Sequence, residues 1–280
     1  MHWDALAIDS IGLDVCVGYI GIRYFQAVTD LPPVVAAPNS NWAATAEFYA
    51  LIPWADSNTT VKGFDAVTTL NPSEIFGEQL QSAFAMRASV EYKRVGLLAD
   101  VSYSQLGAQQ SFNTSSGLLS GNSTVSSING IYDLALRYRF GSREAAVGVP
   151  GEFSLIPYAG VRVVEAQLVV EAQLQNPRQY IKQGKLSRTW AEPLIGLQGS
   201  VFLAPRLRAF GRFDLAGFGL AGEQDLTGNA QLGFGYAVGN NTSLNISMRY
   251  FGQTWNNGAR LDNGYTSHQY GPEVAVKFFF

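Results

Sequence analysis

Apolar and polar residues alternate with a period of two along much of the chain. From Tyr132 to Phe140 every even position carries a large apolar side chain, while Asp133, Arg137 and Arg139 lie at odd positions. The same alternation recurs at 84–91, 97–104, 232–238 and 244–250. Because successive side chains of a strand point to opposite faces, this pattern predicts β-strands that have one apolar and one polar face.

The number of predicted strands depends on the N-terminal region. We expect strands near 43–54, 59–68, 83–93, 95–106, 127–140, 153–168, 189–203, 206–218, 226–238, 242–251 and 270–280. Bacterial single-chain membrane barrels have an even number of strands, so a twelfth is expected at Val15–Gln26. If that segment is not a strand, the barrel has ten. The predicted fold is one all-β domain over 1–280, an antiparallel barrel of about twelve strands, with 1–14 as an N-terminal extension.

A soluble β-sandwich would also alternate, but several features favour a barrel in a membrane. Only 15% of the residues are charged, whereas an average soluble domain has about 25%. The predicted strands run to about ten residues, which is the length that a tilted membrane strand requires. Aromatic residues collect near the strand ends, as expected at membrane interfaces. No stretch contains the roughly 18 apolar residues that a spanning helix needs.

The predicted connections alternate between short and long. Short turns are expected at 93–94, 204–206, 239–241 and around Asp56–Asn58, and long polar loops at 106–124, 171–188, 219–225 and 251–269. Outer-membrane barrels have short periplasmic turns and longer extracellular loops. The connection at 141–152 is the exception, because it is longer than a periplasmic turn should be.

Two local motifs add detail to this arrangement. Residues 163–174 spell Val-Val-Glu-Ala-Gln-Leu twice, and an even repeat keeps each side chain on its face. It predicts a long hairpin arm above the membrane. Near 72–81 a short helix is expected, because Asn71 can cap it, Pro72 suits its first position and Glu74 can close a capping box. This helix is either a loop between strands, which we favour, or a plug in the barrel mouth.

The end of the chain carries an alternating pattern that finishes in phenylalanine. Its members are Tyr270, Val274, Val276, Phe278 and Phe280, with Pro272 the odd residue. The pattern resembles the C-terminal strand of Gram-negative outer-membrane β-barrel proteins, many of them small and uncharacterised. The stretches 190–196, 212–219 and 235–236 also resemble recurrent strands of these barrels, so the resemblance covers roughly 42–280. It implies location in the bacterial outer membrane, with the C-terminal strand as the assembly signal that the barrel-assembly machinery reads. It implies an architecture and not an activity.

The polar faces of the strands hold the candidate site. Alternation directs the following charged side chains into the lumen: Glu47, Arg87, Glu91, Asp100, Asp133, Arg137, Arg139, Arg162, Glu192, Arg212, Asp214, Arg249, Glu273 and Lys277. An Arg facing lipid at mid-membrane would cost about 2–4 kcal/mol, so inward placement is strongly favoured. Both signs occur in comparable number. The side chains form either an ion-pair network that closes the lumen, which we favour, or a ring that lines a narrow pore.

Other chemistry has little support in the sequence. A formal charge of -3 and a pI near 5.4 offer no basic patch for nucleic acid. One cysteine, Cys16, and two histidines, His2 and His268, predict neither a metal site nor a cofactor. Ser267 and His268 are adjacent, so on a strand they would point to opposite faces and could not form a direct catalytic pair.

The sequence therefore predicts a non-enzymatic outer-membrane barrel with a charge-lined lumen. Its role is either structural and surface-presenting or that of a narrow passive channel. We expect a monomer whose partners are outer-membrane lipid, lipopolysaccharide and the assembly machinery, with no nucleic acid. The alternative is an outer-membrane enzyme of the lipid hydrolase or deacylase type, with its site at the extracellular rim.

Overall fold

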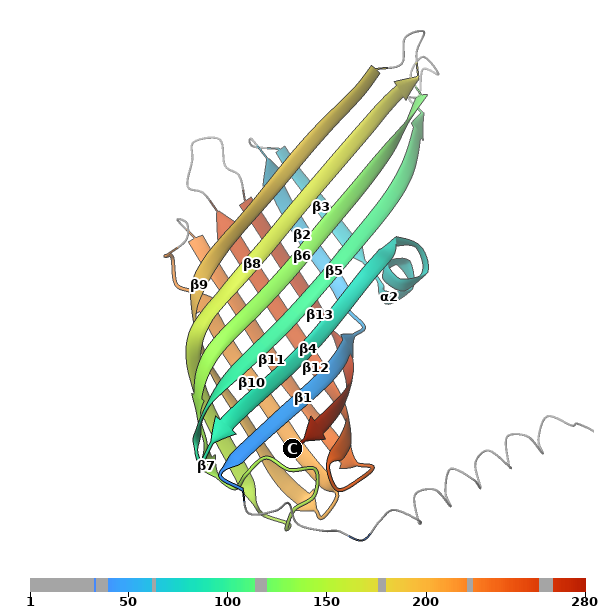
Figure 1. The fold of residues 1–280 in the computed structure, drawn as a ribbon. Coiled ribbons are helices and arrows are strands. Elements are labelled where there is room, and N and C mark those ends of the chain that lie inside the picture. The colour runs from blue at the N-terminus through green and yellow to red at the C-terminus, as the bar shows by residue number, and fades with distance from the viewer. Residues whose placement is uncertain are drawn as a thin grey trace, which may run out of the picture.

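The computed structural model describes residues 33, 40–61, 64–113, 120–175, 180–220, 224–256 and 264–280. Ten strands form a closed antiparallel ring (Figure 1). In ring order they are β1 (Trp42–Leu51), β4 (Leu80–Tyr92), β5 (Val95–Asn113), β6 (Ser120–Tyr138), β8 (Phe153–Gln175), β9 (Tyr180–Ala204), β10 (Leu207–Gly217), β11 (Gln224–Ala237), β12 (Thr242–Asn256) and β13 (Gly264–Phe279). Pairing of β1 with β13 closes the ring.

The fold is thus the predicted all-β antiparallel barrel, with the lower of the two predicted strand numbers. The strand expected at Val15–Gln26 and the extension expected at 1–14 lie outside the described residues, as does Cys16. None of the helices in the described residues is long and apolar enough to cross a membrane.

Three further strands lie outside the ten-stranded ring: β2 (Trp54–Val61), β3 (Phe64–Leu70) and the two-residue β7 (Phe140–Gly141). β1 and β2 follow one another along the same edge of β13, and β3 pairs with β2. The chain bends between them at Ile52–Pro53, where the Ile52 amide donates to the Pro272 carbonyl at 2.9 Å. Gly271 allows this close approach, because a Cβ there would lie 2.2 Å from the Ile52 oxygen.

The turn expected around Asp56–Asn58 is therefore wrong. These residues belong to β2 and pair with Thr266–His268 of β13. Asp, Ser and Asn are typical turn residues, but pairing with residues 208 to 212 positions further along the chain overrides that local preference.

The long loops expected at 106–124, 171–188 and 251–269 are also mostly strand. β5 and β6 stay paired out to Asn113 and Ser120, and β8 and β9 out to Leu174 and Tyr180. The predicted hairpin arm is therefore present as the upper part of β8 and β9, and Figure 1 shows β5, β6, β8 and β9 rising beyond the rest of the barrel. Hydrophobic alternation ends where neither face of a strand meets lipid, so it could not reveal these extensions.

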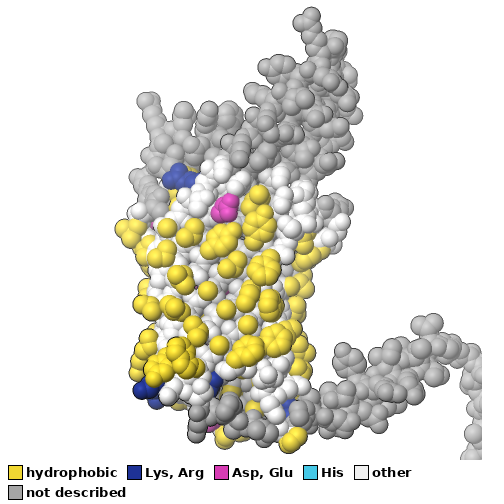
Figure 2. Space-filling model, viewed as in Figure 1, with side chains coloured by type: hydrophobic (Ala, Val, Ile, Leu, Met, Phe, Trp, Pro, Cys, Tyr) yellow, Lys and Arg dark blue, Asp and Glu magenta, His cyan; other side chains and the backbone are white. Residues whose placement is uncertain are grey.

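The outer surface of the ring is apolar. Outward side chains such as Leu136 and Ile246 are 64% and 65% exposed, and Figure 2 shows hydrophobic side chains covering the wall between the two ends. Aromatic pairs lie at both borders, with Trp42 and Tyr92 at 5.0 Å between ring centroids at one end and Trp54 and Tyr270 at 6.1 Å at the other. This arrangement is the apolar band with aromatic girdles that a membrane barrel requires.

The short connections 93–94, 205–206 and 238–241 lie at one end, together with the C-terminus. The longer connection 142–152 lies at this end too, and it folds against the barrel. Its Gly148 amide donates to the Pro205 carbonyl at 3.1 Å, while Ala146 and Val147 are buried with Ala237 and Phe279. The unexpected length of this turn therefore supplies a cover for this end of the barrel.

The helix expected near 72–81 is present as a short α-helical turn, α2 (Pro72–Glu74), followed by a π-helical turn, η1 (Ile75–Gln79). Its capping box forms as predicted: Asn71 Oδ1 accepts from the Glu74 amide at 3.0 Å, and Glu74 accepts from the Asn71 amide at 2.9 Å. The helix lies beside the wall at the upper end of β4 (Figure 1), which favours a helical loop over a plug.

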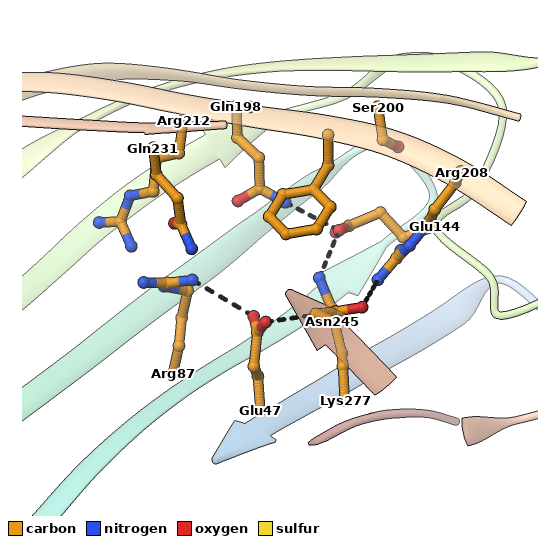
Figure 3. A pocket seen from close by; sticks show the side chains of 12 residues that line it. Glu47, Arg87, Glu144, Gln198, Ser200, Arg208, Arg212, Gln231, Asn245 and Lys277 are labelled. Carbon is orange, nitrogen blue, oxygen red and sulfur yellow. Dashed lines mark hydrogen bonds and ion pairs between the residues drawn. The ribbon is translucent and has the colours of Figure 1, made fainter. Parts of the chain in front are cut away.

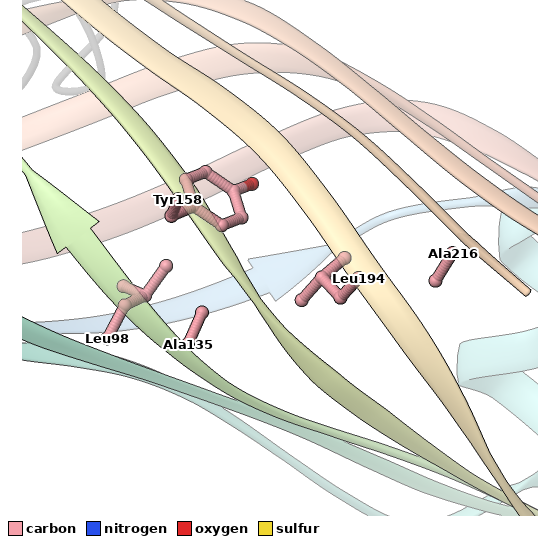
Figure 4. Packing of buried hydrophobic residues seen from close by; sticks show 5 residues of the cluster. All are labelled: Leu98, Ala135, Tyr158, Leu194 and Ala216. Carbon is pink, nitrogen blue, oxygen red and sulfur yellow. The ribbon is translucent and has the colours of Figure 1, made fainter.

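The lumen contains a small apolar patch as well as charges. Leu98, Ala135, Tyr158, Leu194 and Ala216, from five consecutive strands of the ring, form one buried cluster (Figure 4). The Tyr158 hydroxyl donates to Asp214 at 2.9 Å. The patch thus borders the charged side chains described next.

Candidate functional site

The structure places all the charged residues of the candidate site inside the barrel. Their exposed fractions run from 1% to 8%: Glu47, Arg87, Glu91, Asp100, Asp133, Arg137, Arg139, Arg162, Glu192, Arg212, Asp214, Arg249, Glu273 and Lys277. Each lies on the strand face opposite the lipid-facing apolar residues. Side chains that line a water-filled channel would be wetted, whereas these are sealed from solvent.

Arg162 is the centre of the main cluster. Its Nε and Nη2 donate to the two carboxylate oxygens of Asp133 at 2.7 and 2.8 Å, and Nη2 also donates to Asp214 at 2.7 Å. Asp133 is the direct cross-strand neighbour of Arg162, so β6 and β8 align this pair. Asp214 lies on β10, two strands further around the ring. The bidentate geometry is the strongest form of a charge-assisted hydrogen bond.

Arg212 joins this cluster to the opposite wall. It forms ion pairs with Asp100, with Asp214 at 3.1 Å and with Asp133 at 3.5 Å. Asp100 in turn binds Arg87 at 2.9 Å, and Arg87 continues to Glu47 at 3.3 Å. A continuous chain of alternating charges therefore crosses the lumen from β8 to β1.

Neutral side chains satisfy the remaining carboxylate oxygens. The Tyr49 hydroxyl donates to Asp100 at 2.8 Å, and Asn245 donates to Glu47 at 2.8 Å. A further pair, Arg249 with Glu273 at 3.0 Å, is held by hydrogen bonds to Asn229 and Gln231. Buried charges are tolerated when they are paired and hydrogen-bonded in this way.

Glu192 differs from the other acids, because no ion pair to it forms among the described residues. It accepts hydrogen bonds from Trp190 Nε1 at 2.6 Å and from the Thr227 hydroxyl at 2.9 Å. The Thr227 hydroxyl also accepts a hydrogen bond from Arg162 at 3.1 Å and so links Glu192 to that guanidinium. Above this level Trp190, Trp255 and Val164 form an apolar cluster. It covers the network on the side away from the short turns.

A second cluster lies at the end with the short turns. Arg139 binds Glu91 at 2.7 Å, Arg137 binds Glu91 at 3.3 Å, and Arg137 also binds Glu144 at 2.6 Å. Lys277 completes the cluster with a 2.9 Å contact to Glu144. Glu144 comes from the connection 142–152, which explains why that connection turns inward.

The pKa of Glu144 is set by these contacts. Burial by itself raises the pKa of this carboxyl, but the Lys277 ammonium and then the Arg137 guanidinium more than offset that effect. The net result is a pKa well below the ordinary value of 4.5. Glu144 therefore stays ionised at neutral pH.

The sequence interpretation missed three buried charged residues: Glu144, Arg208 and Asp225. Period two could have found Arg208, because it lies four positions before Arg212 on the same face of β10. Asp225 precedes the predicted start of its strand by one residue. Nothing local marks Glu144, since turns carry no alternation.

The positions of Ser267 and His268 do not support the hydrolase alternative. Ser267 is buried and faces the lumen, while His268 is exposed on the outer face. His268 Nδ1 lies 2.7 Å from the Tyr250 hydroxyl, and the two rings stack at 6.0 Å. Among the described residues no group of three or more His, Cys, Asp or Glu side chains could hold a metal ion.

The sequence matches no protein-family model, and no curated protein is similar to it in sequence. Among solved structures, the outer-membrane protease OmpT from Escherichia coli aligns over 89% of this chain and 99% of its own, with a TM-score of 0.51 and 10% identity. The attachment invasion locus protein Ail from Yersinia pestis covers 85% of this chain and 98% of its own, with a TM-score of 0.29 and 12% identity. The monoaromatic hydrocarbon channel CymD covers 87% of this chain and 89% of its own, with a TM-score of 0.33 and 11% identity.

At such identities the likeness concerns the fold alone. Fold does not imply function, so this likeness does not decide the activity. The closed ring, the apolar outer belt and the polar interior agree with that likeness. The chain is therefore a transmembrane β-barrel of the bacterial outer membrane.

Proposed function

We propose that this chain is a closed, surface-presenting barrel and not a passive channel or an enzyme. The observation that carries the proposal is the burial of the lumen charges, none of the predicted set being more than 8% exposed. All of these charges except Glu192 form ion pairs with one another or, for Lys277, with Glu144, so they are not available to bind a permeating ion. A pore would need them wetted and open to exchange.

The extended strands support the presenting role. β8 has 23 residues and β9 has 25, whereas a tilted membrane strand needs about 9–11. Roughly a dozen residues of each strand therefore remain beyond the bilayer, or about 40 Å of strand at ~3.3 Å per residue. By the usual rule that short turns are periplasmic, this extension lies outside the cell.

Conductance in planar bilayers tests closure. We expect purified protein to give no steady ohmic current, while an open sixteen-stranded porin in the same bilayers conducts. A steady, ion-selective current from this protein would support the narrow channel and refute the closed barrel.

A shortened variant tests presentation. Gln167 and Ser187 are cross-strand partners, so residues 168–186 can be replaced by an Asn-Gly turn that joins them. We expect this variant to keep the heat-modifiable migration of a folded barrel. Antibodies against the 168–186 peptide should label intact cells that express the full chain and not cells that express the variant. Failure to label intact cells would refute surface presentation.

We also propose that the barrel works as a monomer surrounded by outer-membrane lipid and lipopolysaccharide, after delivery by the barrel-assembly machinery. The belt of exposed apolar side chains supports lipid contact. The alternating C-terminal strand supports recognition during assembly. Light scattering in detergent, corrected for bound detergent, is expected to give the mass of one chain, and a dimer would contradict the proposal.

A further inference from the structure

Arg208 is a buried cation whose charge no carboxylate balances directly. Its exposed fraction is 3%, and within the described part of the chain no ion pair includes it. Its two hydrogen bonds, both from Nη2, reach the neutral acceptors Ser243 Oγ and Asn245 Oδ1 at 3.2 Å each. Among the described residues, its Nε has no hydrogen-bond partner. An Arg stays protonated in proteins, so this positive charge cannot be removed by losing a proton.

The guanidinium also lies among aromatic rings. Its Cζ is 4.9 Å from the centre of the Phe279 ring and 5.8 Å from that of Phe210. These rings attract the cation weakly but supply no counter-charge. The site therefore favours a mobile anion more strongly than a hydrated arginine at the surface would.

A cavity of about 20 Å³ adjoins Arg208 (Figure 3). Four cationic and two anionic side chains line it: Arg87, Arg208, Arg212 and Lys277, with Glu47 and Glu144. Arg87, Arg212 and Lys277 each form an ion pair with a carboxylate. Arg208 alone among the four forms none in the described barrel.

The two carboxylates of the cavity wall already accept hydrogen bonds from other side chains. Glu144 accepts from Lys277 at 2.9 Å, from Gln198 at 2.8 Å and from Arg137 at 2.6 Å. Glu47 accepts from Asn245 at 2.8 Å and from Arg87 at 3.3 Å. Their charges reach Arg208 only from beyond ion-pair distance. Arg208 is therefore the cation of the cavity wall with which an anion in the cavity would pair.

We infer that the cavity beside Arg208 binds one chloride ion. A cavity needs about 10–15 Å³ to hold a single water molecule, so the observed volume has room for one monatomic anion. The Arg208 guanidinium supplies the charge, and the Ser200 hydroxyl of the wall can donate a hydrogen bond to the ion. This site is independent of the proposed presenting function.

Unfolding by urea in nonionic detergent tests the site, with sodium chloride replaced stepwise by sodium gluconate at constant ionic strength. Gluconate is too large for the cavity and controls for general screening. Above the dissociation constant, each tenfold rise in chloride should raise the folding equilibrium constant about tenfold for one site. Arg208→Met should abolish this dependence, whereas Arg94→Met, in the exposed turn between β4 and β5, should keep it.

Equal urea midpoints in chloride and gluconate would overturn the inference, and so would a chloride dependence that survives Arg208→Met. If Arg208→Met fails to fold, crystals of the unaltered protein grown in sodium bromide decide the question. An anomalous peak in the cavity beside Arg208 supports the site. Its absence at a wavelength where bromide scatters anomalously refutes it.

Discussion

Removing Arg162 should destabilise the barrel more than removing any exposed charge. Arg162→Ala takes from Asp133 both of its short contacts, at 2.7 and 2.8 Å. The nearest cation left to Asp133 is then Arg212 at 3.5 Å. Asp214 loses one contact but keeps Arg212, Tyr158 and Asn229. The variant therefore leaves the buried Asp133 carboxylate almost without a counter-charge.

The size of the effect follows from that geometry. Breaking a buried ion pair by removing one partner costs about 3–5 kcal/mol, which is roughly a hundredfold to several-thousandfold in the folding equilibrium constant. An exposed arginine such as Arg94 should change stability by no more than about 0.5 kcal/mol when replaced by alanine. Urea unfolding in detergent micelles, followed by tryptophan fluorescence and by heat-modifiable migration, measures both variants under one condition.

A double-mutant cycle separates the free energy of the ion pair from the effect of lost side-chain packing. Arg162→Met with Asp133→Asn removes both charges while keeping similar side-chain volumes. The double variant should be destabilised by clearly less than the sum of the two single variants, because neither charge is left unpaired. Near-additive losses, or a loss below about 1 kcal/mol for Arg162→Ala, would mean that water screens the lumen as it screens surface charges. The closed-lumen interpretation would then be refuted.

Three further predictions follow from other parts of the barrel. Phe280→Ala should lower the yield of membrane-inserted barrel, because it removes the final residue of the assembly signal. The substitution keeps the backbone hydrogen bonds of residue 280 with Ala44, at 2.9 and 3.1 Å. A normal yield would count against that signal. An epitope inserted at Asn240 should be detected only after cells are permeabilised, and detection on intact cells would reverse the orientation. Glu144→Gln should lower the free energy of unfolding by its full amount at pH values above about 4.5, and by less as the pH falls further. The reason is that the pKa of Glu144 in the folded protein lies below that ordinary value. A loss of stability that does not change with pH would show that the charge of Glu144 does not matter.

Alternation alone was enough to assign the two faces of most strands. Arg137 and Arg139 had to face inward once Leu136 and Tyr138 faced lipid, and both are buried. It could not assign β2 and β3, nor the upper parts of β5, β6, β8 and β9. Those segments lie beyond the apolar belt, so no difference between lipid and lumen imposes a period on their residues.

Pairing within the lumen was predictable only between neighbouring strands. Arg162 with Asp133 and Arg87 with Glu47 are direct cross-strand partners, so register brings each pair together. Arg212 with Asp100 joins residues 112 positions apart on strands that do not touch. That contact depends on how many strands close the ring and how far they are staggered. The sequence left the strand number open between ten and twelve, and therefore left these contacts open as well.

Glu144 illustrates the same limit at the end of the barrel with the short turns. Arg137 and Lys277 both face inward there, and without a third group between them two cations would be buried close together. Glu144 lies between them, at 2.6 Å from Arg137 and 2.9 Å from Lys277. The need for this anion arises only when β6 and β13 face each other across a closed ring, so no local feature of 142–152 could have announced it. A connection that is too long for a periplasmic turn, opposite an excess of inward cations, is therefore a signal worth seeking in other barrels.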